Sequence, residues 1–494
     1  MAMTRLSLAA LARVPEQSRP LVAPGSVGPG IVHLGLGAFH RAHQAVYTEE
    51  ALAAAGGDWG IVGVAPRSAD IVAALQEQDR LFSVTAVSGA GRHTRVVGAL
   101  TGVRHAAADP DAVVALLADP TIRVVTLTVT EKAYRLDPAG GRLTVDDDLR
   151  ADLTGDRPPS TVPGLLVRGL IARYRAGAGP IALVSCDNLP SNGRRLRSLV
   201  DQALRYAGPP VADGTRDWVA GQVSFPGTMV DRIVPAATPQ ALADAAAALG
   251  AADLAAVTGE PYRQWVLEDD FPGGRPAWER AGAVLTDDAA PWEQLKLRAL
   301  NGVHSAVAYL GALAGRETIE EALRIPGLTE AMRRFVAEDV AGSFHPPDGV
   351  SVVAYGDEAL DRFANPAIEH RTVQVAMDGS QKLPQRVLHT IAACRAAGAT
   401  PRWAALVVAA WMRFVQGTAD DGRQLPLDDP LADQIRARLA QAPATPDGVV
   451  TALFGLRSVF PAELAADDTV RALVTDWLTA LDKHGVEATL DGAP

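Results

Sequence analysis

The sequence predicts an α/β fold in which residues 1–290 form a doubly wound parallel sheet and residues 291–494 form a mainly α-helical second domain. Strand-like apolar runs alternate with helix-like segments in the first part, while long amphipathic segments dominate the second. A chain of 494 residues is also too long for a single hydrophobic core. Two domains of different character are therefore expected.

The first element is the apolar run 31–34, which leads into Gly35, Leu36 and Gly37 and then a helix-compatible segment. In a dinucleotide site such glycines let the backbone approach the pyrophosphate, and the following helix supplies free N–H groups. His40 occupies the third glycine position of the usual GxGxxG pattern, so a plain strand-turn-helix corner remains an alternative. The pattern favours a Rossmann-type domain whose cofactor turn is formed by residues 35–37.

A second strand is expected at 59–64, followed by Arg67 and Asp70. The carboxylate that reads the cofactor ribose normally lies near the end of this strand, which makes Asp70 a candidate for NAD binding. Arg67 and Ser68 could equally receive a 2′-phosphate. The expected cofactor is NAD, and NADP stays open.

Two further strands are expected at 123–129 and 180–185, and each runs into a polar loop. The first loop begins with Thr130, Glu131 and Lys132, and the second spans 186–193. Ligands of open parallel sheets bind where strands end in such loops. Both loops are therefore candidate parts of a binding site.

Helical periodicity dominates the chain after Trp292, and an alanine-rich stretch in the first domain also predicts a helix. The tail from about Glu487 is expected to be loose. The predicted helical segments are 241–256, 317–323, 328–340, 388–397 and 401–415.

Within this helical part, residues 292–305 place four polar groups on one side of a predicted α-helix. Taking Lys296 as zero, Glu293 falls near 60°, His304 near 80° and Asn301 near 140° at about 100° per residue. Such a mixed face is typical of a helix that lines a polar cleft. A buried lysine can act as a base when its pKa falls. The alternative is an ordinary solvated helix face.

Composition restricts the class of protein. The net charge of −11 argues against a broad nucleic-acid surface, and two cysteines are too few for a disulfide framework. The longest apolar run, 403–412, is shorter than the roughly 18 to 20 residues that span a bilayer. His33, His40 and His43 cluster, but without an HExxH or CxxC pattern, so no metal is expected. A cytoplasmic enzyme without a membrane or nucleic-acid partner is predicted.

Seven ordered motifs resemble those of the polyol-specific long-chain dehydrogenases, the mannitol dehydrogenase family, over nearly the whole length. The motifs are GLGAFHRAHQ (35–44), TVTEKAY (128–134), SCDNLPSNG (185–193), FPGTMVDRIVP (225–235), QWVLEDDF (264–271), KLRALNGVHS (296–305) and DGSQKLPQR (378–386). The resemblance implies zinc-independent, nicotinamide-dependent oxidation and reduction. It also places Phe39 in the cofactor-binding motif.

The resemblance further implies residue roles. Lys296 matches the catalytic acid and base, and Asn192 and Asn301 match the pair that stabilises a developing alkoxide. His304 matches a contact to a substrate hydroxyl, and Glu293 a residue linked to proton passage. Asp231 and Lys382 match positions that line the substrate pocket. The structural alternative for Asp231 is an ion pair with Arg232 or a turn cap, and the alternative for Lys382 is a solvated lysine.

Four basic residues, two within these motifs and two in the segments EPYRQW and EHRTVQ, resemble the fructuronate reductase (mannonate oxidoreductase) branch of the family. They are Lys132, Arg263, Arg371 and Arg386, whereas Gln374 stands where the mannitol-oxidising branch tends to carry arginine. A guanidinium can hold the carboxylate of a hexuronate, which a sugar alcohol lacks. Surface ion pairs are the alternative for Arg263 and Arg371.

The implied reaction is therefore the interconversion of D-fructuronate and D-mannonate, with mannitol 2-dehydrogenase or a related polyol dehydrogenase as the alternative. Ala69 replaces an acid of mannitol-oxidising members, which weakens the case for strict NAD preference. A nucleotide-binding sensor without turnover is a third possibility. The expected partner is a small sugar acid or polyol. Family members are often monomers, which is the state expected here.

Overall fold

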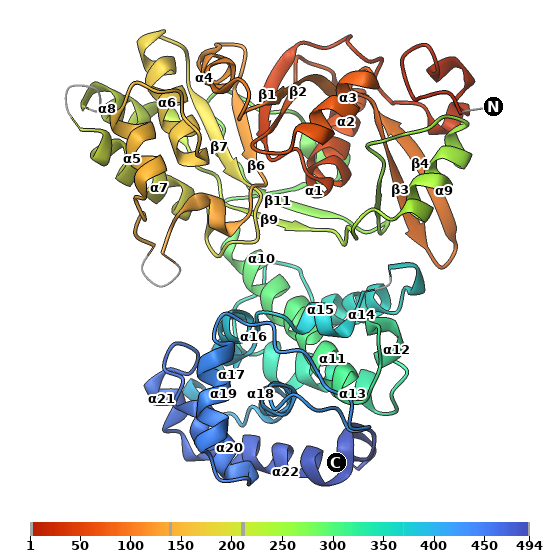
Figure 1. Ribbon diagram of the computed structural model, residues 1–494, viewed down its shortest axis with the longest axis vertical. Helices are drawn as coiled ribbons and strands as arrows, with labels where there is room; N and C mark the ends of the chain where they lie inside the picture. The colour runs from red at the N-terminus through yellow and green to blue at the C-terminus, as the bar shows by residue number, and fades with distance from the viewer. Residues whose placement is uncertain (1–2, 138–140, 209–212, 369, 493–494) are drawn as a thin grey trace. The chain divides into compact units, whose positions relative to one another are not determined.

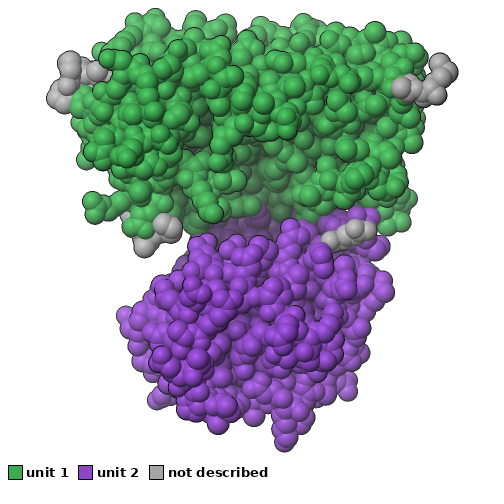
Figure 2. All heavy atoms as spheres, viewed as in Figure 1, with its two compact units in different colours: residues 1–290 green, residues 291–494 purple. Residues whose placement is uncertain are grey.

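The computed structural model describes residues 3–137, 141–208, 213–368 and 370–492. The chain divides into two compact units, Met1–Ala290 and Pro291–Pro494, which Figure 2 shows in different colours. Among the described residues, no helix combines the length and apolar character needed to cross a membrane. Each unit is considered by itself.

Unit 1 is built on a six-stranded parallel sheet with the order β5-β2-β1-β6-β7-β8 (Figure 1). The chain starts at the centre, adds β2 and β5 on one side, and then returns to add β6, β7 and β8 on the other. Strand order therefore reverses between β1 and β6, where open α/β sheets bind ligands. The strands are β1 Pro29–Leu34, β2 Gly60–Ala65, β5 Leu100–His105, β6 Val124–Leu127, β7 Ile181–Ser185 and β8 Val223–Ser224.

Alternate side chains of the central strands pack into two separate apolar cores. Ile31 and Ile61 join one core with α2 and α3, while Val32 and Val125 join the other with α4 to α7. Burial on both faces explains why these strands appear in the sequence as continuous apolar runs. The helices of unit 1 are α1 Ala38–Ala42, α2 Gln44–Ala55, α3 Ala69–Glu77, α4 Pro110–Ala118, α5 Asp147–Thr154, α6 Val162–Arg175, α7 Asn192–Ala207, α8 Asp213–Gln222 and α9 Pro239–Leu249.

Two smaller three-stranded sheets complete unit 1, with the orders β10-β3-β4 and β12-β11-β9. The helix predicted for 241–256 is wrong beyond Leu249, because Gly250 takes a left-handed conformation with φ +67° and Val257 begins β10. The added strands are β3 Phe82–Ser88, β4 Gly91–Val97, β9 Thr228–Asp231, β10 Val257–Gly259, β11 Gln264–Glu268 and β12 Val284–Thr286.

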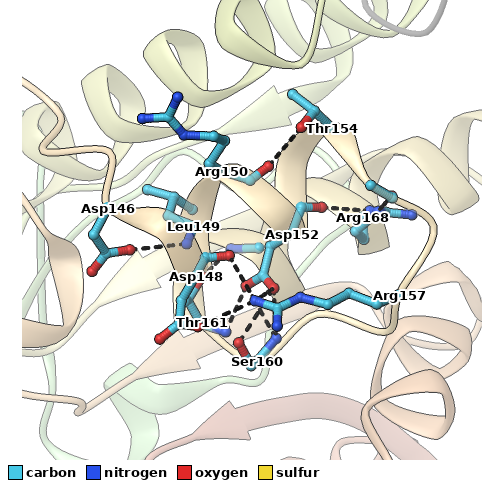
Figure 3. A network of polar contacts seen from close by, with 12 residues as sticks. Asp146, Asp148, Leu149, Arg150, Asp152, Thr154, Arg157, Ser160, Thr161 and Arg168 are labelled. Atoms are coloured by element: carbon cyan, nitrogen blue, oxygen red, sulfur yellow. Dashed lines mark hydrogen bonds and ion pairs between the residues drawn. The ribbon is translucent and has the colours of Figure 1, made fainter.

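A buried carboxylate, Asp152 of α5, fixes the loop between α5 and α6 (Figure 3). It accepts the backbone N–H groups of Ser160 at 3.0 Å and Thr161 at 2.8 Å, and Arg157 lies 3.7 Å away. A Cβ at position 164 would lie 2.4 Å from Asp152 Oδ2, so Gly164 allows the close approach of α6. This network therefore holds the helix α6 that covers one face of the sheet.

Unit 2 is helical, which together with the sheet of unit 1 confirms the predicted fold class. Helices α11 and α18 are buried on nearly all sides, as expected for central helices of a helical core. The helices are α10 Ala290–Leu295, which crosses the boundary between the units, α11 Gly302–Leu313, α12 Ile319–Ala322, α13 Leu328–Arg334, α14 Val352–Phe363, α15 Thr372–Ala376, α16 Gly379–Leu383, α17 His389–Ala396, α18 Arg402–Phe414, α19 Ala432–Gln441, α20 Pro446–Phe454, α21 Ala462–Ala465 and α22 Asp468–Asp491.

The end of the chain is better ordered than the sequence suggests. Helix α22 continues to Asp491, Glu487 forms an ion pair with Arg316 at 2.5 Å, and Leu490 is buried. The prediction of a loose tail from Glu487 is therefore wrong for the described residues.

Three helical segments of unit 2 contain π-helical turns: Lys296–Asn301, Phe335–Val340 and Pro384–Leu388. The first of these turns contacts the other two. Turns of this kind are rare in proteins, and those that occur are often found at functional sites. They place Lys296 and Arg386 on neighbouring irregular turns.

Candidate active site

The turn after β1 is formed by glycines for two different reasons. Gly35 has φ +105°, and a Cβ there would lie 2.0 Å from the carbonyl oxygen of Thr128. Gly37 has an ordinary extended conformation, and the nearest atom to an added Cβ would be 3.8 Å away. Gly35 is thus required by the fold itself, whereas Gly37 leaves an open backbone surface at the edge where strand order reverses. This arrangement fits the pyrophosphate of a dinucleotide.

Two apolar residues of this motif pack against the core. Leu36 is 2% exposed and packs over Gly63, where a Cβ would approach it to 2.5 Å. Phe39 is half-buried and stacks on His43 with ring centroids 4.9 Å apart. A cofactor could therefore meet the backbone of Leu36 rather than its side chain.

His40, which replaces the third glycine of the fingerprint, stacks on His33 of β1 with ring centroids 3.4 Å apart. His33 contacts the Thr126 hydroxyl at 2.7 Å and the Gly35 carbonyl at 3.0 Å. Burial lowers the pKa of His33 to about 3 and that of His40 well below its ordinary value. Two neutral rings therefore fill the space beneath the turn.

Arg67 and Asp70 follow the carboxyl end of β2, the neighbour of β1. Both are exposed, and Asp70 lies in the first turn of α3. The carbonyl of Arg67 accepts a hydrogen bond from His105 Nε2 at 3.1 Å. Both an acidic and a basic residue thus follow the strand after which a ribose would be bound, which is compatible with NAD and with NADP.

Asn192 begins α7 and is held against β9. Its Oδ1 accepts the Thr228 N–H at 2.9 Å, while Nδ2 lies 3.0 Å from the Thr228 carbonyl and 3.3 Å from the Asp187 carbonyl. A Cβ on Gly193 would lie 2.4 Å from the Phe225 carbonyl, so only glycine allows α7 to begin here. The amide is therefore oriented in advance by the backbone.

The remaining predicted residues of unit 1 differ in their surroundings. Asp231 is buried at the end of β9. Arg263 forms an ion pair with Glu50, with a second contact of 3.1 Å, and lies over the Tyr47 ring at 4.5 Å. Lys132 is exposed in a short 3-10 turn. The guanidinium of Arg263 is thus already paired with a carboxylate.

In unit 2, Lys296 is 8% exposed and begins the first π-helical turn. Glu293 lies half-buried on α10, and Asn301 ends the same π-helical turn half-buried. The regular α-helical angles expected for 292–305 are wrong across this turn, because a π-helix carries more residues per turn than an α-helix.

His304 lies on α11 one turn after Asn301. Its ring stacks on Phe363 at 4.4 Å and on His370 at 5.2 Å, and its Nε2 is shielded from solvent without a hydrogen-bond partner among the described residues. Burial lowers the pKa of His304 well below its ordinary value, and the positive charges of Arg386 and Lys382 act in the same direction. The imidazole is therefore neutral at neutral pH.

Arg386 lies on the third π-helical turn and donates to Ser305 Oγ at 2.9 Å and to the Asn301 carbonyl at 3.4 Å. Burial lowers the pKa of Arg386 to about 10. Lys382 donates to the backbone carbonyls of Val375 and Met377 at 3.3 and 2.5 Å. The structure thus links Arg386 directly to the backbone of Asn301.

One feature of this group could not be inferred from the sequence. The rings of Phe363 and His370 stack on His304 although they come from distant segments, and no sequence motif indicates this contact. Arg371, by contrast, is exposed at the start of α15. Within the described part of the chain, no group of three or more His, Cys, Asp or Glu side chains is placed to hold a metal ion.

The strand order and the glycine turn define unit 1 as a Rossmann-type nucleotide-binding unit. Comparison with known proteins gives the family. Residues 29–280 match the mannitol dehydrogenase Rossmann domain, and residues 288–481 match the mannitol dehydrogenase C-terminal domain. The chain therefore belongs to the mannitol dehydrogenase family, and it is an oxidoreductase that acts on CH–OH groups.

Individual relatives cover nearly the whole chain. An uncharacterized oxidoreductase of Escherichia coli K12, YeiQ, is 42% identical over 90% of this chain and 91% of its own length. D-mannonate oxidoreductase of the same organism is 38% identical, with 92% and 93% covered. The solved structure of Pseudomonas fluorescens mannitol 2-dehydrogenase with NAD and D-mannitol is 32% identical, has a TM-score of 0.85 and covers 99% of both chains.

Proposed function

We propose that this protein is an NAD(H)-dependent oxidoreductase that interconverts D-fructuronate and D-mannonate. The observation that carries the proposal is the guanidinium of Arg386, which donates to Ser305 Oγ at 2.9 Å on the residue after His304, with Lys382 one helical turn before Arg386. An anionic keto sugar acid would be favoured there over a neutral ketose. The similarity to D-mannonate oxidoreductase supports the same substrate class.

The glycine turn supports a nicotinamide dinucleotide as the cofactor, in agreement with the NAD present in the solved relative. The backbone of Gly35, Leu36 and Gly37 would hold the pyrophosphate, and Asp70 or Arg67 would read the ribose. The nicotinamide supplies the hydride for ketone reduction and accepts it in the reverse direction.

Lys296 supplies the proton. In the reduction, its ammonium group protonates the carbonyl oxygen as negative charge develops on that atom, and the neutral amine takes the proton back in the oxidation. Glu293, one turn earlier on the same helical segment, would exchange the proton with solvent. This chemistry needs no metal ion, and activity is expected to survive EDTA.

Asn192 and Asn301 stabilise the alkoxide. Two fixed amide donors lower the energy of the transition state where charge gathers on oxygen. Of the Asn192 Nδ2 contacts, the one to the Asp187 carbonyl is the longest at 3.3 Å. We assign the N–H on that side to the substrate oxygen, because giving up the weakest contact costs least.

His304 and the basic residues position the rest of the substrate. A neutral imidazole can both donate to and accept from a sugar hydroxyl. Arg386 binds the carboxylate bidentately, and the further proposed substrate-binding residues are Asp231, Lys132, Lys382 and Arg371. Arg263 is the weakest member of this set, because Glu50 already neutralises it.

The pairing of Arg263 also favours one alternative, a mannitol 2-dehydrogenase that interconverts D-mannitol and D-fructose. The two proposals are separated by following the oxidation of NADH and of NADPH by absorbance, with D-fructuronate and D-fructose side by side and EDTA present. A kcat/KM at least about tenfold higher for D-fructuronate supports carboxylate recognition, since tenfold corresponds to about 1.4 kcal/mol. A preference for D-fructose rejects it.

A further inference from the structure

The carboxylate of Asp187 joins the loops that follow β6 and β7. Asp187 lies in the SCDNLPSNG motif, but the proposed mechanism gives its side chain no role. Its oxygens accept the backbone N–H of Val129 at 3.0 Å and that of Thr130 at 2.9 Å. The Tyr134 hydroxyl donates to the same carboxylate at 2.7 Å. Three donors of the loop after β6 therefore converge on one side chain of the loop after β7.

Thr130 has an unusual backbone conformation. Its φ is +72° and its ψ is 157°. This region is occupied almost only by glycine, and a β-branched residue there is strained. Such a conformation persists only where the surroundings impose it. The two hydrogen bonds to Asp187 hold the consecutive peptide N–H groups of Val129 and Thr130, and so fix the chain on the N-terminal side of the strained φ.

The loop that carries Asp187 also carries Asn192. The backbone carbonyl of Asp187 lies 3.3 Å from Asn192 Nδ2, and Ser191, which precedes Asn192, has a left-handed φ of +51°. Each of the two loops joined by Asp187 thus contains a strained non-glycine residue. Backbone strain of this kind clusters at ligand-binding and catalytic positions.

Tyr134 offers a way to separate the parts of this network. Its hydroxyl donates to Asp187 and also lies 2.6 Å from Ser185 Oγ, and burial raises the pKa of Tyr134 well above its ordinary value. The hydroxyl therefore stays protonated. Its removal deletes the contacts to Asp187 and Ser185 and leaves the two backbone contacts of Asp187 in place.

We propose that Asp187 is a positioning residue whose carboxylate holds the strained backbone at Thr130 and so fixes the loop after β6 beside Asn192. The proposal rests on the proposed function for its effect on catalysis. Asp187 contacts neither substrate nor cofactor in this role. It acts through the two loops that it joins.

The test compares Asp187→Asn, Tyr134→Phe and the double variant Asp187→Asn with Thr130→Gly. Asparagine keeps the shape of the side chain but loses the second acceptor oxygen. We expect Asp187→Asn to lower kcat by about tenfold or more, with the Kd for NADH changed by less than about threefold. Tyr134→Phe should stay within about threefold of the wild type in kcat.

The double variant tests the role of strain. Glycine adopts positive φ without a steric cost, so the native loop no longer needs to be imposed. We expect Thr130→Gly to restore kcat of Asp187→Asn at least about threefold. A residue that merely supported the core would show no such rescue.

Hydrogen exchange of the peptide spanning 128–135, measured on the substrate-free protein, gives a readout independent of activity. The exchange should be faster in Asp187→Asn and unchanged in Tyr134→Phe. Unchanged exchange together with unchanged kcat in Asp187→Asn overturns the proposal, and so does a loss of activity that Thr130→Gly does not rescue. If the wild type reduces no keto sugar while exchange still separates the variants, loop fixation by Asp187 is supported and the proposed function fails.

Discussion

The glycine turn after β1 allows stability and cofactor binding to be separated with two single substitutions. In Gly35→Ala, the new Cβ would lie 2.0 Å from the Thr128 carbonyl oxygen, whereas Cβ contacts in proteins are essentially never below 3.0 Å. The backbone must therefore move by about 1 Å or more to accept the alanine. Positive φ adds about 1–2 kcal/mol for a non-glycine residue. We expect a total loss of about 3 kcal/mol or more, which places this variant among the severe ones.

Gly37→Ala should behave differently. Its φ of −83° is allowed for alanine, and the nearest atom to the new Cβ is 3.8 Å away. The protein without cofactor should therefore keep its thermal midpoint. If the pyrophosphate packs against this backbone, the added methyl group must displace it, and the Kd for NADH should rise at least about tenfold, or about 1.4 kcal/mol.

The assays are thermal unfolding without cofactor and titration of NADH fluorescence. Gly89→Ala is a matched control, because nothing lies within 4 Å of its added Cβ. We expect that control to change neither measurement. Wild-type NADH affinity in Gly37→Ala would refute the reasoning that the open backbone at this turn receives the cofactor.

Three further predictions follow from particular contacts. Arg386→Gln should lower kcat/KM for D-fructuronate by about tenfold or more, because the guanidinium can pair with a carboxylate. The same substitution should lower kcat/KM for D-fructose much less. Equal losses on both substrates would count against carboxylate binding. Asp152→Ala should lower the free energy of unfolding by about 2 kcal/mol, because it removes the acceptor of the buried Thr161 N–H and of the more exposed Ser160 N–H. Asp148→Ala, at an exposed position one turn earlier, should cost less than about 1 kcal/mol, and denaturant titration distinguishes the two variants. Because burial lowers the pKa of His304, the folded protein binds fewer protons than the unfolded chain below about pH 6.5, and the free energy of unfolding falls as the pH falls. His304→Asn should make this fall shallower by up to about 1.4 kcal/mol per pH unit. Equal slopes in the two proteins would contradict the assignment.

The fold could be predicted because local and tertiary signals agree. The strands around Val32 and Val125 are buried on both faces, so their sequences are continuous apolar runs, and the turn at Gly35 needs a positive φ that only glycine adopts freely. The helix predicted for 241–256 failed where a single glycine, Gly250, stopped it. The end of α22 could not be foreseen, because its order depends on distant partners such as Arg316.

For the candidate site, the sequence indicates which residue types take part but not how they are arranged in space. Sequence periodicity assumed a regular α-helix at Lys296, but a π-helical turn begins there, and it leaves no mark in the spacing of apolar residues. The sequence around Arg263 does not show that its guanidinium pairs with Glu50, because Glu50 is far away in the sequence. The strain at Thr130 likewise depends on Asp187 and has no local signal. The roles of the individual residues stay predictions.

The most direct test of the central claim follows the hydride itself. NADH that carries deuterium at both hydrogen positions of nicotinamide C4 is incubated with D-fructuronate, and the product is analysed by mass spectrometry and NMR. We predict D-mannonate that carries one deuterium at the former ketone carbon, and a rate that falls by about 100-fold or more in Lys296→Ala. Product without deuterium, or an unchanged rate in Lys296→Ala, would contradict the account.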